Sequence, residues 1–256
     1  MKTIAIVTGA SSGIGKEFFL SLLDKNLDEI WVVARREKEL LALQNLTEIP
    51  LRVFALDLSK ENAVEPVKTA LNGDEYTVKY LICASGFGRF SATKDDESAV
   101  LENMVDLNCR SIVSMTHAVY PYLTKDSLVM LVASVASFQP IPYVATYGAS
   151  KAFVLSYGRA LNVELKKDKG ARVLCVCPFW TKTAFFDRAE SNERIVKKYV
   201  AMYTPSQIVK RAWKDAKKKR KDVSVYGGKA KFQALLVKLL PHRLVMRVWC
   251  RQQKLK

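Results

Sequence analysis

A short apolar run at the N-terminus leads directly into a glycine-rich turn. Residues 4–7 are Ile-Ala-Ile-Val, residues 8–15 are Thr-Gly-Ala-Ser-Ser-Gly-Ile-Gly, and apolar residues then recur at helical spacing. This order predicts a strand, a tight turn and a helix. Glycines in such a turn let the backbone approach a pyrophosphate, and the helix N-terminus favours its negative charge. The expected cofactor contacts here are Gly9, Ser11, Ser12, Gly13, Ile14 and Gly15.

Further apolar runs alternate with helical patterns along the chain. Strands are predicted at residues 29–34, 51–56, 78–83, 128–132, 171–177 and 223–226, with helices between them. This alternation predicts an α/β fold, a Rossmann-like doubly wound parallel sheet with helices on both faces. A chain of 256 residues that is 49% hydrophobic can bury one core. We therefore expect a single catalytic domain over residues 1–228, followed by a tail over residues 229–256.

A second stretch carries residues suited to proton transfer. Tyr147 and Lys151 are four residues apart, so on a helix they share a face. The ammonium group is then expected to lower the pKa of the phenol, which is ordinarily about 10. Ser134 follows a predicted strand and could hold a substrate oxygen. Tyr-x-x-x-Lys alone also fits a surface contact, and the glycine-rich turn is what favours the catalytic interpretation.

Together these stretches closely resemble the short-chain dehydrogenase/reductase family. Its signature is a Thr-Gly-x-x-x-Gly-x-Gly turn followed by a serine and Tyr-x-x-x-Lys, and the resemblance covers roughly residues 1 to 228. It implies that Ser134 binds the substrate oxygen, that Tyr147 is the acid/base, and that Lys151 also binds the nicotinamide ribose. It further implies that Asn108 joins a proton relay, and that the protein is a homo-oligomer, a dimer or tetramer.

The resemblance also implies cofactor contacts after three later strands. An aspartate after the third strand contacts the adenine in the family, although an acid there also fits an ordinary turn. The usual Asn-Asn-Ala-Gly is Cys-Ala-Ser-Gly at residues 83–86, which removes side-chain amides but keeps a close approach to the cofactor. A phenylalanine, Phe179, replaces the glycine of the usual Pro-Gly and narrows the pocket or moves its loop. The implied contacts are Asp57, Leu58, Ala84, Ser85, Gly86, Pro178, Thr181 and Thr183.

Two arginines end the second predicted strand, where an acidic residue would accept a hydrogen bond from a ribose 2′-hydroxyl. Arg35 and Arg36 would instead neutralise a 2′-phosphate. We therefore expect NADP(H) as cofactor, with Arg35 the main contributor. The alternative is that both arginines begin the next helix in solvent.

These residues predict an NADP(H)-dependent oxidoreductase that reversibly reduces a ketone or aldehyde. Phe179, Trp180, Phe185 and Phe186 indicate an apolar pocket and a hydrophobic substrate, although each could also be core packing. A non-catalytic NADP(H)-binding sensor on the same fold is the competing hypothesis. It is disfavoured because a sensor has no need of the complete catalytic set.

The formal charge of +16 belongs mainly to the end of the chain. Residues 205–256 contain sixteen of the 41 Lys and Arg residues, against only two acids, Asp215 and Asp222. Aromatic residues are few there and no recognition motif for nucleic acid is present, so nucleic-acid binding is disfavoured.

The tail has the pattern of two amphipathic helices. The predicted apolar stripe contains Phe232, Leu235, Leu236, Leu239 and Leu240, then Leu244, Val245, Val248 and Trp249 after Pro241. Lysine and arginine occupy other faces, and the basic residues leave no apolar run long enough to span a bilayer. The stripe could cover the substrate pocket, contact another subunit or lie on an anionic membrane.

Five cysteines, an odd number mostly in apolar runs, suit a reducing compartment better than a disulfide framework. Cys175 and Cys177 fit a buried strand, and no metal site is predicted. The N-terminus enters a strand directly, so no signal peptide is expected. We therefore expect a cytoplasmic protein, with possible peripheral attachment to the inner face of a membrane.

Overall fold

A parallel sheet forms the centre of the computed structural model, which describes residues 1–73, 75–189 and 195–255. Within these ranges the sheet has seven strands in the order β3-β2-β1-β4-β5-β6-β7, and all neighbouring strands are parallel. The strands are β1 (Lys2–Thr8), β2 (Glu29–Ala34), β3 (Leu51–Ala55), β4 (Tyr76–Cys83), β5 (Leu128–Val132), β6 (Arg172–Val176) and β7 (Val223–Ser224). The order reverses between β1 and β4, where a sheet of this kind opens a crevice at its carboxyl edge.

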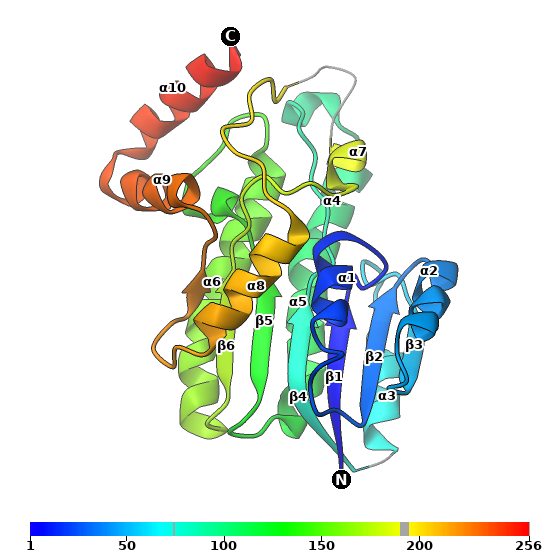
Figure 1. The fold of residues 1–256 in the computed structure, drawn as a ribbon. Helices are drawn as coiled ribbons and strands as arrows, with labels where there is room; N and C mark the ends of the chain where they lie inside the picture. The colour runs from blue at the N-terminus through cyan, green and yellow to red at the C-terminus, as the bar shows by residue number, and fades with distance from the viewer. Residues whose placement is uncertain (74, 190–194, 256) are drawn as a thin grey trace.

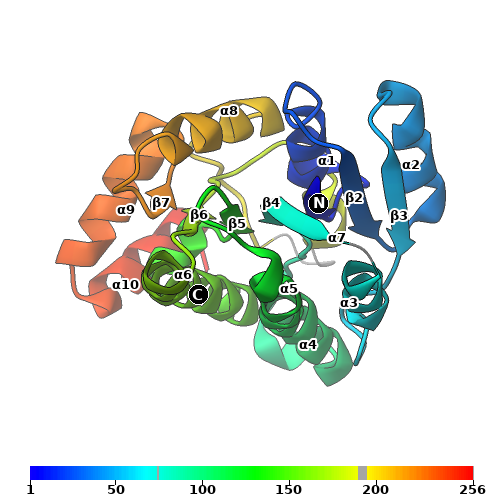
Figure 2. The same ribbon diagram turned by 90° about the horizontal axis from the view of Figure 1, so that it is seen from below.

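Helices cover both faces of the sheet, as Figure 2 shows. Together α1, α2 and α8 lie on one face, and α3, α4, α5 and α6 lie on the other. The helices are α1 (Gly13–Leu20), α2 (Glu37–Leu41), α3 (Glu65–Asn72), α4 (Ser98–Val105), α5 (Ser111–Val119), α6 (Ala145–Asp168), α7 (Phe185–Ala189), α8 (Pro205–Ala216), α9 (Gly228–Leu239) and α10 (His242–Gln253). The predicted doubly wound fold is confirmed.

The first strand explains how the sheet holds both layers. Along β1, Ile4 and Ile6 pack into the core under α3 to α6, while Ala5 and Val7 pack into the core under α1 and α8. All four side chains are fully buried. Strands of a parallel sheet are buried on both faces, so they read as continuous apolar runs rather than alternating ones.

The last two helices extend from the β7 edge of the sheet and follow one another across Pro241 (Figure 1). Helix α9 packs on the protein through Ala230, Ala234 and Val237 rather than through the large apolar residues of the predicted stripe. The two alanines allow a close approach of the helix, so the larger side chains of the stripe on α9 remain outside, and their contact with a subunit or a membrane stays a prediction. Within the described ranges, no helix is both long and apolar enough to cross a bilayer.

Candidate active site

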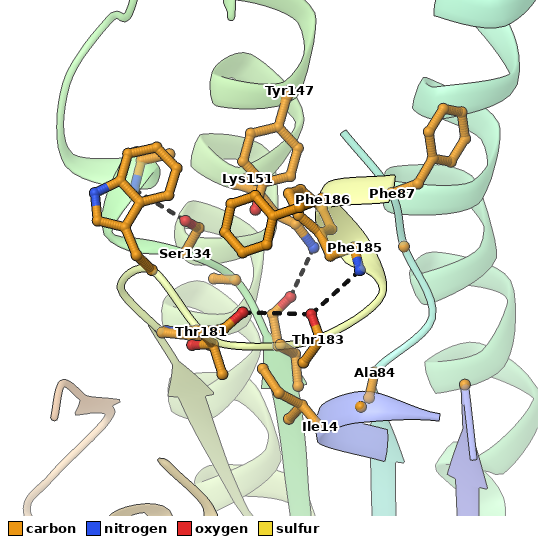
Figure 3. A pocket seen from close by; sticks show the side chains of 18 of the residues that line it. Ile14, Ala84, Phe87, Ser134, Tyr147, Lys151, Thr181, Thr183, Phe185 and Phe186 are labelled. Carbon is orange, nitrogen blue, oxygen red and sulfur yellow. Dashed lines mark hydrogen bonds between the residues drawn. The ribbon is translucent and has the colours of Figure 1, made fainter. Parts of the chain in front are cut away.

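A cavity of about 460 Å³ lies at the carboxyl ends of the strands. It extends from Arg35 and Arg36 after β2, past the glycine-rich turn, to Trp249 of α10. Figure 3 shows Tyr147, Lys151 and Ser134 gathered in one part of it, and Ile14 and Ala84 in another. The cavity therefore joins the two stretches that the sequence singles out.

The glycine-rich turn brings β1 and β4 into backbone contact. Gly9 has a φ of +70°, and a Cβ atom there would lie 2.8 Å from the amide nitrogen of Ser85. A Cβ atom on Gly15 would lie 2.2 Å from the carbonyl oxygen of Gly9. Thr8 Oγ1 accepts hydrogen bonds from the amides of Ala84 and Ser85 at 3.1 and 3.2 Å. A side chain at Gly9 would force β1 and β4 apart, and one at Gly15 would force α1 away from the turn.

The two arginines after β2 have different contacts. Arg36 Nη2 donates hydrogen bonds to Ser11 Oγ at 3.0 Å and to Ser12 Oγ at 2.8 Å, so its guanidinium lies against the glycine-rich turn. Arg35 also lines the cavity and acts electrostatically on Asp57. Sequence reasoning gave Arg35 the larger role, whereas direct contact with the turn belongs to Arg36.

Asp57 does not line the cavity, where Leu56 and Leu58 form the wall instead. Its Oδ1 atom accepts hydrogen bonds from the amide and the hydroxyl of Ser59 at 3.1 and 2.7 Å. Burial works in the opposite direction, but these hydrogen bonds and the charge of Arg35 lower the pKa of Asp57 below its usual value. Its contacts fit the alternative of a turn-forming acid, and contact with an adenine stays a prediction.

Ser134 is held at the end of β5 by a local hydrogen-bond network. It caps the short 3₁₀ turn Val135–Phe138, where its Oγ accepts from the amide of Ala136 at 3.1 Å. The amide of Ser134 donates to Ser137 Oγ at 3.3 Å, and Ser137 Oγ donates to the carbonyl oxygen of Lys151 at 2.8 Å. Ser137 thereby fixes Ser134 relative to α6, a role that the sequence reasoning missed.

Tyr147 and Lys151 are both in low-dielectric surroundings. Lys151 is 5% exposed, its Nζ atom donates to the carbonyl oxygen of Val132 at 2.9 Å, and it lies 5.9 Å from the centre of the Tyr147 ring. Burial lowers the pKa of Lys151 to about 8. Burial raises the pKa of Tyr147 to about 12, although a hydrogen bond with Ser134 opposes the shift. The predicted lowering of the phenol pKa is therefore wrong for the free protein, because desolvation dominates.

Asn108 lies in a π-helical turn, Asp106–Arg110, that joins α4 to α5. Its side chain is fully buried and accepts from the amide of Phe87, while Nδ2 donates to the Phe87 carbonyl and to Ser150 Oγ, both at 2.9 Å. A Cβ atom on Gly86 would lie 2.8 Å from Asn108 Oδ1 and 3.2 Å from Lys151 Nζ. Asn108 is thus behind the cavity wall rather than on it, and its part in a proton relay stays a prediction.

The loop after β6 forms the part of the cavity wall that lies next to the glycine-rich turn. Pro178 lines the cavity and accepts a hydrogen bond from the amide of Val135 at 2.9 Å. Thr181 and Thr183 also line it, and a Cβ atom on Gly13 would lie 3.2 Å from Thr183 Cγ2. The loop therefore touches the glycine-rich turn, where the sequence places cofactor contacts.

One end of the cavity is aromatic. Phe90, Trp180, Phe185 and Phe186 line it and contact one another, with ring centres between 5.8 and 6.4 Å apart in the contacting pairs. The Tyr147 ring lies 5.4 Å from that of Phe185. The catalytic candidates therefore face an apolar enclosure.

The C-terminal helices complete this end of the cavity. Gln233, Trp249, Gln252 and Gln253 line it. Trp249 Nε1 donates to the carbonyl oxygen of Pro142 at 3.0 Å, so α10 is attached to the loop between Ser134 and Tyr147. Contact with the pocket was one of the alternatives for the tail. Of the tail residues that line the cavity, Trp249 belongs to the predicted apolar stripe and the three glutamines do not.

The residues around the cavity fit a dinucleotide. Two guanidinium groups at one end suit phosphate, and the glycine-rich turn at the N-terminus of α1 suits a pyrophosphate. Of the predicted cofactor contacts, all except Asp57 line the cavity.

Comparison with known proteins gives a consistent result. The family model described as short chain dehydrogenase matches residues 3–194. A very-long-chain 3-oxoacyl-CoA reductase from Neurospora crassa is 32% identical over 222 residues, which are 82% of this chain and 63% of that protein. Sulfoacetaldehyde reductase 2 from Chromohalobacter salexigens is 32% identical over 191 residues, which are 72% of this chain and 75% of that protein.

Solved structures share the fold. A short-chain dehydrogenase from Sphingobium yanoikuyae in complex with NADPH superposes with a TM-score of 0.77 at 24% identity, covering 92% of each chain. A 7β-hydroxysteroid dehydrogenase superposes with a TM-score of 0.81 at 20% identity, covering 96% of each chain.

Proposed function

The chain belongs to the short-chain dehydrogenase family of oxidoreductases, and on that basis we propose that it reduces a ketone or aldehyde of a hydrophobic substrate with NADP(H). The reaction is reversible as an alcohol oxidation. The observation that carries the proposal is the meeting of Ser134, Tyr147 and Lys151 at the aromatic end of the cavity.

The side chains have complementary parts in this reaction. Ser134 holds the substrate oxygen by a hydrogen bond, and Tyr147 donates its phenolic proton to that oxygen as charge develops there. With a pKa near 12, Tyr147 is fully protonated at neutral pH and is ready to act as the acid. Lys151 stabilises the phenolate that remains. The chemistry that a bound nicotinamide supplies is hydride transfer to the carbonyl carbon.

The preference for NADP(H) is supported by the charge at the adenosine end of the cavity. Arg35 and Arg36 both line this end and are exposed, and the residue before them is the buried Ala34. A guanidinium pair suits a 2′-phosphate, whereas a free ribose 2′-hydroxyl is usually held by a carboxylate. A cytoplasmic location is supported by the free cysteine thiols, of which four are buried.

The aromatic wall supports a substrate with an apolar body, such as an acyl-chain ketone. Rings of this kind exclude water and leave few polar groups to bind a hydrophilic substrate. Lys198 lines the cavity and is exposed, so it could receive an anionic group on the far end of such a substrate.

The test is NADPH consumption with a series of ketones and aldehydes of increasing chain length. We expect turnover to rise with chain length, and Tyr147→Phe to lower it by about a hundredfold to ten-thousandfold because the transferable proton is lost. NADPH affinity, measured by calorimetry, should be nearly unchanged. Tyr157→Phe is the matched control, since Tyr157 lies on the same helix and its hydroxyl bonds to Thr116 outside the cavity.

Two outcomes would contradict the proposal. Tyr147→Phe activity within about tenfold of the wild type would remove this residue from the chemistry, since that change is only about 1.4 kcal/mol. Tight NADPH binding without reduction of any carbonyl compound would instead favour the non-catalytic sensor.

A further inference from the structure

The C-terminal helix pair, α9 and α10, has a solvent-facing apolar surface. On α9, Phe232, Leu235 and Leu239 are 66%, 60% and 75% exposed. On α10, Leu244 and Val248 are 45% and 55% exposed. Monomeric proteins seldom leave a contiguous row of large apolar side chains in water, and such rows mark interaction sites.

The same surface carries only positive charge. No aspartate or glutamate occurs between residues 229 and 255. Among the described residues, the basic side chains of the pair form no ion pair with an acid. The exposed basic residues are Lys229, Lys231, Lys238, Arg243, Arg247, Arg251 and Lys254.

On α10 the exposed basic residues and the exposed apolar residues form two neighbouring rows. Arg243, Arg247 and Arg251 follow one another at intervals of four, next to the row of Leu244 and Val248. The arginine row lies opposite the buried Val245 and Trp249, and Leu244 and Val248 lie on the flank between that row and the buried face. Basic and apolar side chains therefore leave the helix side by side toward solvent.

We propose that the helix pair binds the surface of an anionic lipid bilayer, with its apolar residues in the interface and its basic residues at the lipid phosphates. An amphipathic helix binds such a surface through both contributions. Each lysine or arginine near the surface improves binding by about fivefold. The exposed row supplies the hydrophobic part without any spanning helix.

A second copy of the chain is a poorer occupant. A two-fold contact places the same patch on both sides of the interface, so these seven basic residues would face one another with no acid between them. Nucleic acid is also a poorer occupant. Single strands need exposed aromatic rings for stacking, and the exposed row contains one aromatic residue, Phe232, among aliphatic ones.

The helix pair also borders the cavity through its other faces. Gln233 of α9 and Trp249 of α10 line the cavity, while Leu235 and Val248 point to solvent. Docking would therefore place the cavity beside the lipid, where hydrophobic carbonyl compounds dissolve. This consequence rests on the proposed function, whereas lipid binding itself does not.

The experiment is co-sedimentation of the full chain with vesicles. Vesicles of phosphatidylcholine with one third phosphatidylglycerol should bind the protein at low salt, and vesicles of phosphatidylcholine alone should bind it at least tenfold less. High salt should weaken binding, because it screens exposed charges. No binding to the anionic vesicles at low salt would overturn the proposal whether or not the protein is an active reductase.

Three variants separate the contributions. Phe232→Ser/Leu235→Ser/Leu239→Ser should lower binding at least tenfold, and Arg243→Gln/Arg247→Gln should lower it roughly 25-fold. Lys217→Gln/Lys219→Gln removes two exposed charges outside the pair and should have little effect. If the arginine variant and the lysine variant lost the same amount of vesicle binding, or if the serine variant bound as well as the wild type, binding would be general charge attraction. Either result would overturn the proposal. Circular dichroism should show the same helix content in all variants.

Discussion

Burial pushes Tyr147 and Lys151 toward their neutral forms, and the two shifts have different consequences. With its pKa raised to about 12, Tyr147 keeps its proton throughout the physiological range. With its pKa lowered to about 8, Lys151 is the member of the pair that changes charge near neutral pH. We therefore expect the lysine, rather than the tyrosine, to set the pH dependence of this site.

We expect kcat/KM for NADPH to fall as the pH rises through about 8, because Lys151 loses the positive charge that we propose binds the cofactor and stabilises phenolate. This parameter reports ionisations of the free enzyme. In Lys151→Arg the charge persists above pH 12, so any remaining activity should lack the decline. A wild-type profile that stays flat to pH 10 would contradict the assignment.

The two arginines give a prediction about cofactor choice. Arg35→Ala/Arg36→Ala should lower NADPH affinity at least tenfold and change NADH affinity much less, since charge-assisted bonds to phosphate contribute about 1.5–3 kcal/mol. Calorimetric titration of the double variant and both single variants would divide the effect between them. Arg36→Ala also removes the hydrogen bonds to Ser11 and Ser12. If this variant bound both NADPH and NADH more weakly, Arg36 would act by supporting the glycine-rich turn rather than by binding the phosphate.

At the level of the elements, α10 fastens the segment that walls the substrate end. Gln253 is 1% exposed, and its Oε1 atom accepts from the amides of Lys197 and Lys198 at 2.8 and 2.9 Å. Its Nε2 atom donates to the carbonyl oxygen of Lys198 at 3.2 Å. Removing the whole helix pair would therefore disturb the substrate end as well as any lipid contact, which is why point variants are the sharper test.

Gln253→Ala should raise KM for the carbonyl substrate at least tenfold and leave NADPH affinity nearly unchanged. The substitution leaves two partly buried amides without their acceptor, and a fully buried donor left in this way costs about 1–3 kcal/mol, so the segment after residue 195 loosens. Gln253→Glu keeps an acceptor oxygen, so its KM for the carbonyl substrate should be close to that of the wild type. Steady-state kinetics in both substrates would check this, and an equal loss of NADPH affinity would indicate general unfolding instead.

The sequence predicts those elements whose signal is local. The apolar runs predict strands, and the Thr204 capping box predicts the start of α8, where Thr204 Oγ1 accepts from the amide of Gln207. Gln253 carries no such signal, because its partners lie more than fifty residues away in the sequence. The face on which α9 packs was also missed, since alanines at positions 230 and 234 score as weakly apolar but permit the closest approach.

At the level of the whole molecule, two exposed apolar surfaces differ in charge. The helix pair is uniformly basic. The helices α4, α5 and α6, which lie on one face of the sheet, expose Val105, Val113, Phe153 and Val163. Exposed acids such as Glu102 and Glu164 and bases such as Arg159 lie on the same helices. When two copies of a surface with mixed charges meet across a two-fold axis, acids can lie opposite bases. Two uniformly basic surfaces would instead repel each other.

We therefore expect a homodimer through α4, α5 and α6, with the helix pair outside the contact. Phe153→Glu/Val163→Glu should raise the dimer dissociation constant at least about a hundredfold, because each substitution occurs twice in a two-fold interface and each buried side chain contributes about 1.5–3 kcal/mol. Both residues are on α6 and are 42% and 69% exposed, so the monomer should fold normally. Light scattering over a concentration series measures the change. The serine variant of the helix pair should retain the wild-type mass, and a monomeric serine variant would instead assign the subunit contact to α9.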